Sequence, residues 1–394
     1  RQDSLDWSAR RDADPGRGGF LSASVNLGSL PLWKGVQEQP GCELVPFALG
    51  VEDGLIRLDV DSETIYRIEA EYGRDDYTFI TAPPGTSSWG NRLGELYFNR
   101  LVEAVGAPEG KTVLEIGSGT LFLSERLRKE LKARLVIACD PALREVAGTD
   151  GVEVVREYFS AERFEGVNPD LIISINNLEH IADPYAYVAA ARELLEASGG
   201  SLFVVVPDCS RGLRAGDVGI CLHEHMSYFT PTSLAALLSK CGFAVKWTRA
   251  EEDTIFVAAS PGRESAIPAL PAEDGSALLG AFESGLEHAR RLLNGGEFPL
   301  GIHGCGVGLN NYLGMLELPH GAEILLFDGD EQKTGKYLPT FPAPIRSAED
   351  PAYARVGRVV ISAPTYFGEI AAFLERRHGI AGARVASLVP LGGG

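Results

Sequence analysis

The chain has 394 residues, of which 45% are hydrophobic and 23% charged, and this length allows two or three globular domains. Its formal net charge of −18 disfavours nucleic acid and anionic membranes as partners, because a surface that follows a phosphate backbone has to be basic. No apolar run approaches the roughly 20 residues of a membrane span, and the first residues lack a signal-peptide core. We therefore expect a cytoplasmic enzyme with a small-molecule substrate.

Residues 1–108 are predicted to form a mixed N-terminal domain that recognises substrate or acts as a lid. The stretch GLIRLDVD (54–61) alternates apolar and polar residues, as a half-buried strand does. A loop rich in proline and glycine, TAPPGTSSWGN (81–91), follows it. The spacing of apolar residues in RLGELYFNRLVEAV (92–105) then predicts a helix.

Residues 109–260 alternate strand-like apolar runs with amphipathic helices. The strand-like runs are TVLEIG, RLVIACD, LIISIN and SLFVVVP. Such alternation is typical of a doubly wound, Rossmann-like α/β sheet, which buries both of its faces. A linker at 260–276 precedes a second series of strands and helices, so we expect residues 261–394 to form a second Rossmann-like α/β domain.

The clearest chemistry lies in TVLEIGSGTLFLSERL (112–127). A predicted strand runs through Glu115 into Gly117 and Gly119, and a helix begins at once. Glycines at such a bend let the backbone approach a ligand closely. Asp140 ends the next strand, where a carboxylate accepts hydrogen bonds from two ribose hydroxyls. These residues alone fit any nucleoside-binding Rossmann-like domain.

The motifs that follow, EYFSAERF, NNLEHIADP and SLFVVVPD, come in the order found in class I S-adenosylmethionine-dependent methyltransferases, which this segment resembles. One departure is Leu121, where that family has a third glycine. The glycine loop also differs from the G-x-G-x-x-G of dehydrogenases. The resemblance implies S-adenosylmethionine as the cofactor. It assigns Glu115, Gly117 and Gly119 to the amino-acid moiety, Asp140 to the ribose, Tyr158 and Phe159 to the surroundings of the adenine, and Asn177 to the cleft below the sulfonium.

The stretch CLHEHMSYFTP (221–231) follows the predicted strand SLFVVVP, at the sheet edge where ligands bind in open α/β folds. This stretch, together with GIHGCGVGLNNYLGML and VVISAPTYFGEIAAFL near the C-terminus, resembles the nucleotide-deoxysugar C-methyltransferases, which act on 4-keto sugars. The resemblance implies that His225 is the general base and that Glu224 assists it. Imidazole has the near-neutral pKa needed to take a proton next to a ketone, and the resulting enolate then attacks the sulfonium methyl group.

The chain also departs from this second family. Leu222 stands where the family has a tyrosine, and residues 1–100 offer only Cys42 where the family has a cysteine-rich zinc segment, so we expect no metal. If the loop around Tyr77 and Ser87 corresponds to the family's tyrosine- and serine-rich loop, both side chains reach the active site. His180 and His223 are candidate substrate-binding residues, and both also fit the alternative of hydrogen-bonded structural histidines.

A second glycine loop, Gly304 to Gly308, follows a predicted strand, and Asp328 ends the next one. Without the family, this pattern indicates a second nucleotide site. The resemblance implies instead a degenerate Rossmann fold that helps to hold a nucleotide-sugar, with Asn310 and Asn311 placed to meet an anionic ligand at a helix start.

Together these observations predict an S-adenosylmethionine-dependent methyltransferase that acts on a nucleotide-linked sugar, at carbon, in a natural-product or surface-glycan pathway. An O- or N-methyltransferase is an alternative that Leu222 and the missing zinc segment favour. A non-catalytic nucleotide-sugar binding protein is an alternative from a different class.

Overall fold

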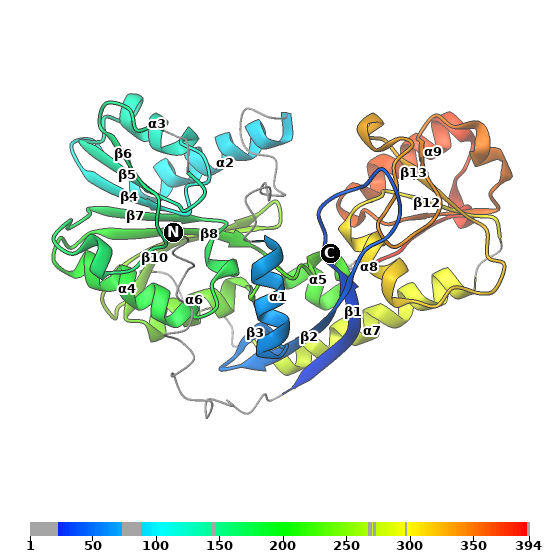
Figure 1. Cartoon of the computed structure of the whole chain (residues 1–394), viewed down its shortest axis with the longest axis horizontal. Coiled ribbons are helices and arrows are strands. Elements are labelled where there is room, and N and C mark those ends of the chain that lie inside the picture. The colour runs from blue at the N-terminus through cyan, green and yellow to red at the C-terminus, as the bar shows by residue number, and fades with distance from the viewer. Residues whose placement is uncertain are drawn as a thin grey trace, which may run out of the picture.

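The computed structural model describes residues 23–72, 88–143, 147–266, 270, 273–295 and 298–391. Three sheets organise these residues. Figure 1 shows two α/β lobes, with strands from the N-terminal part of the chain and one long helix running between them. No helix in the described ranges is long and apolar enough to cross a membrane.

The N-terminal sheet has the strand order β1-β2-β3-β9. Its strands are β1 (Ser24–Pro31), β2 (Leu44–Glu52), β3 (Leu55–Leu58) and β9 (Ser227–Tyr228), and helix α1 (Ser62–Tyr72) follows β3. Asp53 and Gly54 join β2 to β3 with φ angles of 53° and 84°, the positive values that a two-residue Asp-Gly turn requires. The strand predicted within 54–61 is therefore confirmed, whereas the pairing with β9 from the middle of the chain was not predicted.

The central α/β unit contains a seven-stranded sheet with the order β10-β11-β8-β7-β4-β5-β6. Its strands are β4 (Thr112–Ile116), β5 (Leu135–Cys139), β6 (Val152–Val155), β7 (Leu171–Ile175), β8 (Ser201–Pro207), β10 (Phe243–Glu251) and β11 (Thr254–Pro261). Strands β4 to β8 pair in parallel, and β11 and β10 are added antiparallel. Four of the predicted strand-like runs are β4, β5, β7 and β8.

Helices cover both faces of this sheet, since successive strand residues point to opposite sides. These helices are α2 (Ser88–Val105), α3 (Phe122–Lys129), α4 (Pro184–Glu196) and α6 (Pro231–Lys240), whereas α5 (Ser210–Ala215) belongs to a different hydrophobic cluster. Leu114 and Ile172 pack with buried residues of α4 and α6, whereas their neighbours Val113 and Ile173 pack with those of α2 and α3. Figure 1 shows these two helix pairs on opposite sides of the sheet.

The C-terminal α/β unit contains a five-stranded parallel sheet with the order β14-β13-β12-β15-β16. Its elements are β12 (Leu300–His303), α8 (Val307–Met315), β13 (Ile324–Asp328), β14 (Ile345–Ser347), β15 (Arg358–Ile361), α9 (Phe367–His378) and β16 (Val385–Ser387). Short 3-10 helices connect elements along the chain: η2 (Glu162–Phe164), η3 (Leu178–His180), η4 (Val218–Ile220), η5 (Glu331–Lys333), η6 (Pro351–Arg355), η7 (Pro364–Tyr366) and η8 (Gly382–Arg384).

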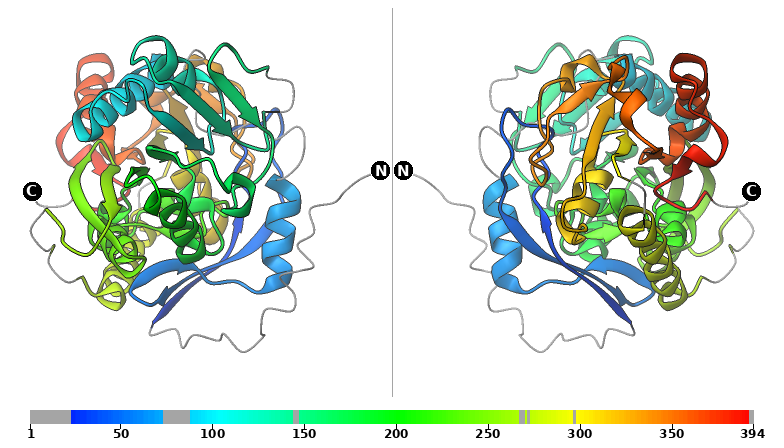
Figure 2. Two further views of the ribbon diagram at one scale, coloured as in Figure 1. Left: turned by 90° about the vertical axis from the view of Figure 1, so that its left-hand side faces the viewer. Right: turned by 90° about the vertical axis from the view of Figure 1, so that its right-hand side faces the viewer.

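Helix α7 (Gly275–Asn294) links the parts of the molecule, because it packs against α5, β1 and β2. One continuous hydrophobic cluster contains Phe47 of β2, Tyr228 of β9, Phe282 of α7, Tyr312 of α8 and Leu326 of β13. In the end-on views of Figure 2, the N-terminal strands run along the lower side of the molecule. The predicted fold class is confirmed: a doubly wound central sheet, a second parallel α/β unit and a mixed N-terminal part.

Candidate functional site

The loop after β4 brings together residues that the sequence analysis assigned to the cofactor. Gly117 and Gly119 have φ angles of 71° and 54°, which side chains rarely adopt. A Cβ on Gly117 would lie 2.6 Å from Cγ of Asn177, so this position has room only for glycine. The backbone N–H of Gly119 donates a hydrogen bond to Oδ2 of Asp140 at 2.7 Å. Leu121, in place of the third glycine, is buried in the hydrophobic core.

Polar groups around this loop fit a nucleoside ligand. Asp140 is buried, and its Oδ1 accepts a second hydrogen bond from the backbone N–H of Ala142 at 2.7 Å. A carboxylate has about four acceptor positions, so Asp140 keeps capacity for ribose hydroxyls. Oγ of Ser118 is buried and has no hydrogen-bond partner among the residues that the structure describes. Buried polar atoms are normally paired, so this hydroxyl fits contact with a polar ligand group.

Glu115 lies beneath the loop. Ser124 in α3 donates a short hydrogen bond to its carboxyl group, which ties the first helix after the loop to β4. Burial raises the pKa of Glu115 to about 8, and the nearby charge of Asp140 contributes in the same direction. This contact gives Glu115 a role in shaping the loop.

The residues expected near the adenine are placed less uniformly. Phe159 stacks on Phe164 with ring centroids 5.9 Å apart and meets the edge of Tyr187 at 5.2 Å. Tyr158 is 51% exposed. Nδ2 of Asn177 donates to the hydroxyl of Tyr187 at 2.9 Å, so Asn177 is connected to the same aromatic group as Phe159.

His225 lies in the segment between η4 and β9. Its ring meets the edge of the His180 ring at 5.1 Å and that of Tyr228 at 6.2 Å, and Nδ1 of His180 bonds the carbonyl of Glu224 at 2.9 Å. Burial lowers the pKa of His225 well below its ordinary value, and the neighbouring His180 lowers it further. His225 is therefore a neutral imidazole at neutral pH, and His180, Glu224 and His225 do come together.

Glu179 is a member of this group that the sequence analysis missed. Its side chain is 2% exposed, its Oε1 lies 3.8 Å from Nε2 of His180, and its Oε2 has no hydrogen-bond partner in the described part of the chain. Burial raises its pKa to about 7, whereas the neighbouring His180 acts to lower it. The signal in the sequence was its position two residues after Asn177, in η3 beyond the end of β7.

Ligand-type atoms of Glu179, His180 and His225 lie within 4.8 Å of one another. Metal–ligand bonds of about 2.0–2.2 Å would place such atoms roughly 3.3 Å apart around a tetrahedral ion. The limit of 4.8 Å also allows wider spacings than this, so the distances do not decide for a metal. The expectation that no metal is needed stays a prediction.

His223 points away from this group. It is 1% exposed, its Nε2 bonds the carbonyl of Val45 at 3.2 Å, and its ring packs edge-on against Phe47 at 4.9 Å. Burial lowers its pKa to about 4. His223 therefore joins its segment to the N-terminal sheet. The predicted contacts of Tyr77 and Ser87 lie outside the described residues.

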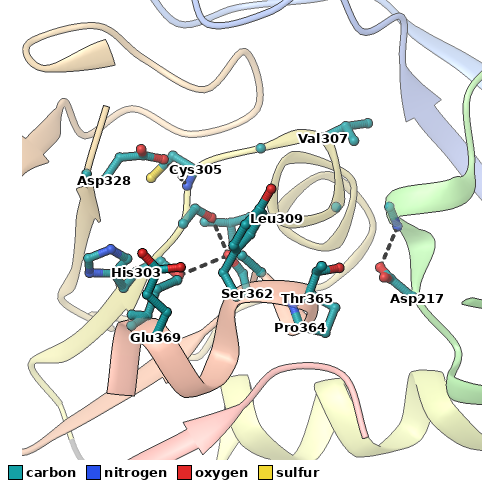
Figure 3. Close-up of a pocket in the computed structure, with 18 of the residues that line it drawn as sticks. Asp217, His303, Cys305, Val307, Leu309, Asp328, Ser362, Pro364, Thr365 and Glu369 are labelled. Atoms are coloured by element: carbon teal, nitrogen blue, oxygen red, sulfur yellow. Dashed lines mark hydrogen bonds between the residues drawn. The ribbon is translucent and has the colours of Figure 1, made fainter. Parts of the chain in front are cut away.

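A cavity of about 950 Å³ opens between the central and C-terminal units. His225 and Leu222 line it from one side, and Gly304, Asp328 and Lys333 line it from the other. Figure 3 shows Asp217 on the opposite side of this space from His303 and Asp328. The volume lies in the range of about 300–1,000 Å³ that is typical of small-molecule sites.

The cavity wall repeats the geometry of the cofactor loop. The backbone N–H of Cys305 donates to Oδ2 of Asp328 at 2.7 Å, as that of Gly119 does to Asp140. Gly304 has a φ of 103° and lies against Ser362 and Ala363 after β15, as Gly117 lies against Asn177 after β7. In addition, Nζ of Lys333 lies 3.0 Å from the Asp328 carboxylate.

Asn310 and Asn311 do not line this cavity, although the sequence analysis assigned them to substrate. Oδ1 of Asn310 accepts a hydrogen bond from the backbone N–H of Thr340 at 3.1 Å. Nδ2 of Asn311 donates to the carbonyls of Val218 and Cys221, both at 2.9 Å. Both asparagines are buried, and Asn311 ties α8 to the segment that carries His225.

Comparison with known proteins identifies the central unit. Residues 90–246 match the family described as "Methyltransferase domain". The C-methyltransferase NovU of Streptomyces niveus is 32% identical over 151 residues, which are 36% of this chain and 35% of that protein. A ubiquinone biosynthesis O-methyltransferase of Cereibacter sphaeroides is 29% identical over 162 residues, which are 37% of this chain and 65% of that protein. A solved structure of human N-acetylserotonin methyltransferase aligns at 13% identity with a TM-score of 0.39, over 52% of this chain and 60% of that chain.

The matches thus take in 35% and 65% of the lengths of the two curated relatives. They establish an S-adenosylmethionine-dependent methyltransferase domain in the central unit, and S-adenosylmethionine is the methyl donor that this family implies. The predicted cofactor is confirmed at that level.

Proposed function

We propose that the protein, whose residues 90–246 form a methyltransferase domain, methylates a nucleotide-linked keto sugar at carbon. The observation that carries this proposal is the shared cavity, which His225 lines together with the glycine loop and Asp328 of the C-terminal unit. A ligand that spans the cavity would have its nucleotide on the C-terminal unit and its sugar at His225.

The groups in the cavity wall suit the two ends of such a ligand. Arg376 provides a cation for a diphosphate, and Arg211 and Lys333, which pair with Asp253 and Asp328, would have to turn towards it. The carboxylates of Asp217 and Asp328 provide acceptors for hydroxyl groups. S-adenosylmethionine would be held by the loop of Gly117 and Gly119 and by Asp140, and it would supply the methyl group.

The proposed reaction begins with His225 as a neutral base. The bond from hydrogen to the carbon next to the ketone breaks, the proton moves to the imidazole, and the electron pair forms an enolate. Bound S-adenosylmethionine would supply its methyl group to the enolate carbon and would leave as S-adenosylhomocysteine. Glu224 is placed beside His225 in the chain, and its carbonyl orients His180.

A second candidate function is O- or N-methylation of a sugar or another small molecule. Leu222 supports it, because an apolar side chain lines the cavity where the C-methyltransferase family offers a tyrosine hydroxyl. The similarity to the ubiquinone biosynthesis O-methyltransferase supports it as well. In that reaction His225 would take a proton from a hydroxyl or an amine.

Proton exchange separates the two functions. In deuterated water without a methyl donor, the wild-type enzyme should exchange the proton next to the ketone of a nucleotide-linked 4-keto sugar. His225→Ala should abolish that exchange and lower methyl transfer by roughly 10²–10⁴-fold, the usual effect of losing a general base. Methyl transfer to a substrate that has no exchangeable carbon-bound proton would exclude C-methylation and leave the O- or N-transfer.

Calorimetric titration with S-adenosylhomocysteine tests the third alternative, a non-catalytic nucleotide-sugar binding protein. A methyltransferase should bind S-adenosylhomocysteine, and His225→Ala should bind it as well as wild type does. Asp140→Ala should bind it more weakly, because hydrogen bonds to a charged acceptor contribute about 1.5–3 kcal/mol. Binding of a nucleotide-sugar without any binding of S-adenosylhomocysteine would favour the non-catalytic protein.

A further inference from the structure

We propose that Glu179 is the positioning carboxyl group of His225: its ionised form makes the half-buried imidazole basic enough to take the substrate proton. This inference rests on the proposed C-methylation and adds to it a residue outside the stretch CLHEHMSYFTP. Glu179 comes from η3, after β7, whereas His225 comes from the segment before β9. The two residues meet only in the folded chain.

The geometry around Glu179 leaves one oxygen available. Its side chain is 2% exposed, and its Oε2 has no hydrogen-bond partner among the described residues. The backbone carbonyl of Glu179 accepts a hydrogen bond from the N–H of Met226 at 2.7 Å, so its main chain is fixed next to His225. A carboxylate and an imidazole nitrogen of these two residues lie within 4.8 Å of each other.

His225 needs such a partner. Burial lowers its pKa well below the ordinary value, and a weakly basic imidazole takes a proton from carbon poorly. A negative charge within this distance favours the protonated form and raises the basicity. When His225 takes the carbon-bound proton, its positive charge faces the ionised Glu179. His180, whose ring lies 5.1 Å from that of His225 and whose side chain is 33% exposed, offers the proton a route to solvent.

The pH dependence follows from the state of Glu179. Burial raises its pKa to about 7, so the ionised form increases as pH rises through this value, and catalysis should rise with it. The titratable groups that face Glu179 are His180, Glu224, His225, Tyr97, Tyr187 and Cys209. Burial raises the pKa values of Tyr97, Tyr187 and Cys209, which therefore stay neutral from pH 6 to 9.

The test compares Glu179→Gln and Glu179→Asp with the exposed control Glu165→Gln in the full chain. The quantities measured from pH 5.5 to 9 are kcat/KM for methyl transfer and the rate of proton exchange in deuterated water. Wild type and Glu165→Gln should show a rise near pH 7. Glu179→Gln should lose this rise and be slower at pH 8 by roughly 10–10³-fold, less than the loss in His225→Ala. Glu179→Asp, which keeps a carboxyl group, should retain a rise.

Affinity for S-adenosylhomocysteine should be the same in all these variants, which shows that the fold is intact. If Glu179→Gln does not fold, the pH profile of Glu179→Asp decides. Its rise should lie at a different pH from that of wild type, and a rise at the same pH would assign the titration to another group. An unchanged rise in Glu179→Gln would overturn the proposal while leaving C-methylation in place. Loss of wild-type activity on chelation, with recovery on adding Zn²⁺ or Mg²⁺, would overturn it in favour of a metal site. If wild type exchanges no proton, the proposed function fails and this inference fails with it.

Discussion

At the scale of single residues, two buried carboxyl groups distinguish the methyltransferase domain. Glu115 lies in β4 below the glycine loop, and Glu179 lies after the neighbouring strand β7. Burial raises their pKa values to about 8 and about 7 respectively, because a charged carboxylate loses the water that stabilises it. Both residues therefore hold protons under conditions in which an exposed glutamate is ionised.

This property predicts how stability depends on pH. Because the pKa of Glu115 is higher in the folded chain than its ordinary value, its contribution to stability is full below about pH 4.5 and is lost as pH rises through about 8. Glu115→Gln can still accept the hydrogen bond from Ser124 and cannot ionise. Its melting temperature should equal that of wild type near pH 5 and exceed it at pH 9, by the equivalent of a few kcal/mol.

The measurement is thermal unfolding of both proteins across that pH range, with the exposed Glu165→Gln as the control. Wild-type and Glu115→Gln curves that stay parallel from pH 5 to 9 would contradict the assignment of the raised pKa to Glu115.

At the scale of elements, helix α8 is fixed to the central unit through Asn311. Its Nδ2 satisfies two buried carbonyl groups, those of Val218 and Cys221, which flank the start of the His225 segment. Asn311→Ala would leave both carbonyls without a partner, at a cost of about 1–3 kcal/mol for each. We expect the free energy of unfolding in urea to fall by this order, with little change for the exposed Asn294→Ala on α7. Equal effects of the two substitutions would contradict the role of Asn311.

The sequence predicted which residues meet at the ends of neighbouring parallel strands. It did not predict contacts between segments that only the fold brings together. Gly117, Gly119 and Asp140 follow two neighbouring parallel strands, so their spacing predicts that they meet. Asn310 was expected to meet an anion from its place at a helix start. In the structure its Oδ1 accepts a hydrogen bond from Thr340, thirty residues further along the chain. The sequence offered the place of Glu179 after Asn177 but could not show that His225 lies close to it, because the His225 segment is held by β9, a strand of two residues that has no pattern of its own.

At the scale of the whole molecule, the hydrophobic cores do not follow the order of the chain. The cluster that contains Val25 and Phe47 of the N-terminal sheet also contains Phe282 of α7 and Ile302 of β12. The central sheet instead packs in two other clusters. The N-terminal sheet and the C-terminal unit therefore share one hydrophobic core, although they lie near opposite ends of the chain.

This arrangement predicts shared unfolding. In native-state hydrogen exchange, backbone amides of β1 and β2 should open with the same free energy as those of β12 and β13, since opening either part exposes the same core. Amides of β4 and β7 should form a separate group. Exchange from β1 and β2 at much lower free energy than from β12 would show that the N-terminal sheet is only loosely attached.

The pairing of β9 with β3 has a consequence for how this protein can be divided. A fragment cut at the limits of the family match, residues 90–246, would keep Ser227 and Tyr228 but lose the strand to which Ile56 and Arg57 belong. The edge of β9 would then be unpaired, and the buried aromatic side chain of Tyr228 would lie beside it. Unpaired strand edges of this kind promote aggregation. By pairing with β9, strand β3 thus stabilises the segment that carries His225. We expect a chain in which residues 90–246 alone are exchanged to aggregate wherever the new partner lacks a strand that pairs with β9.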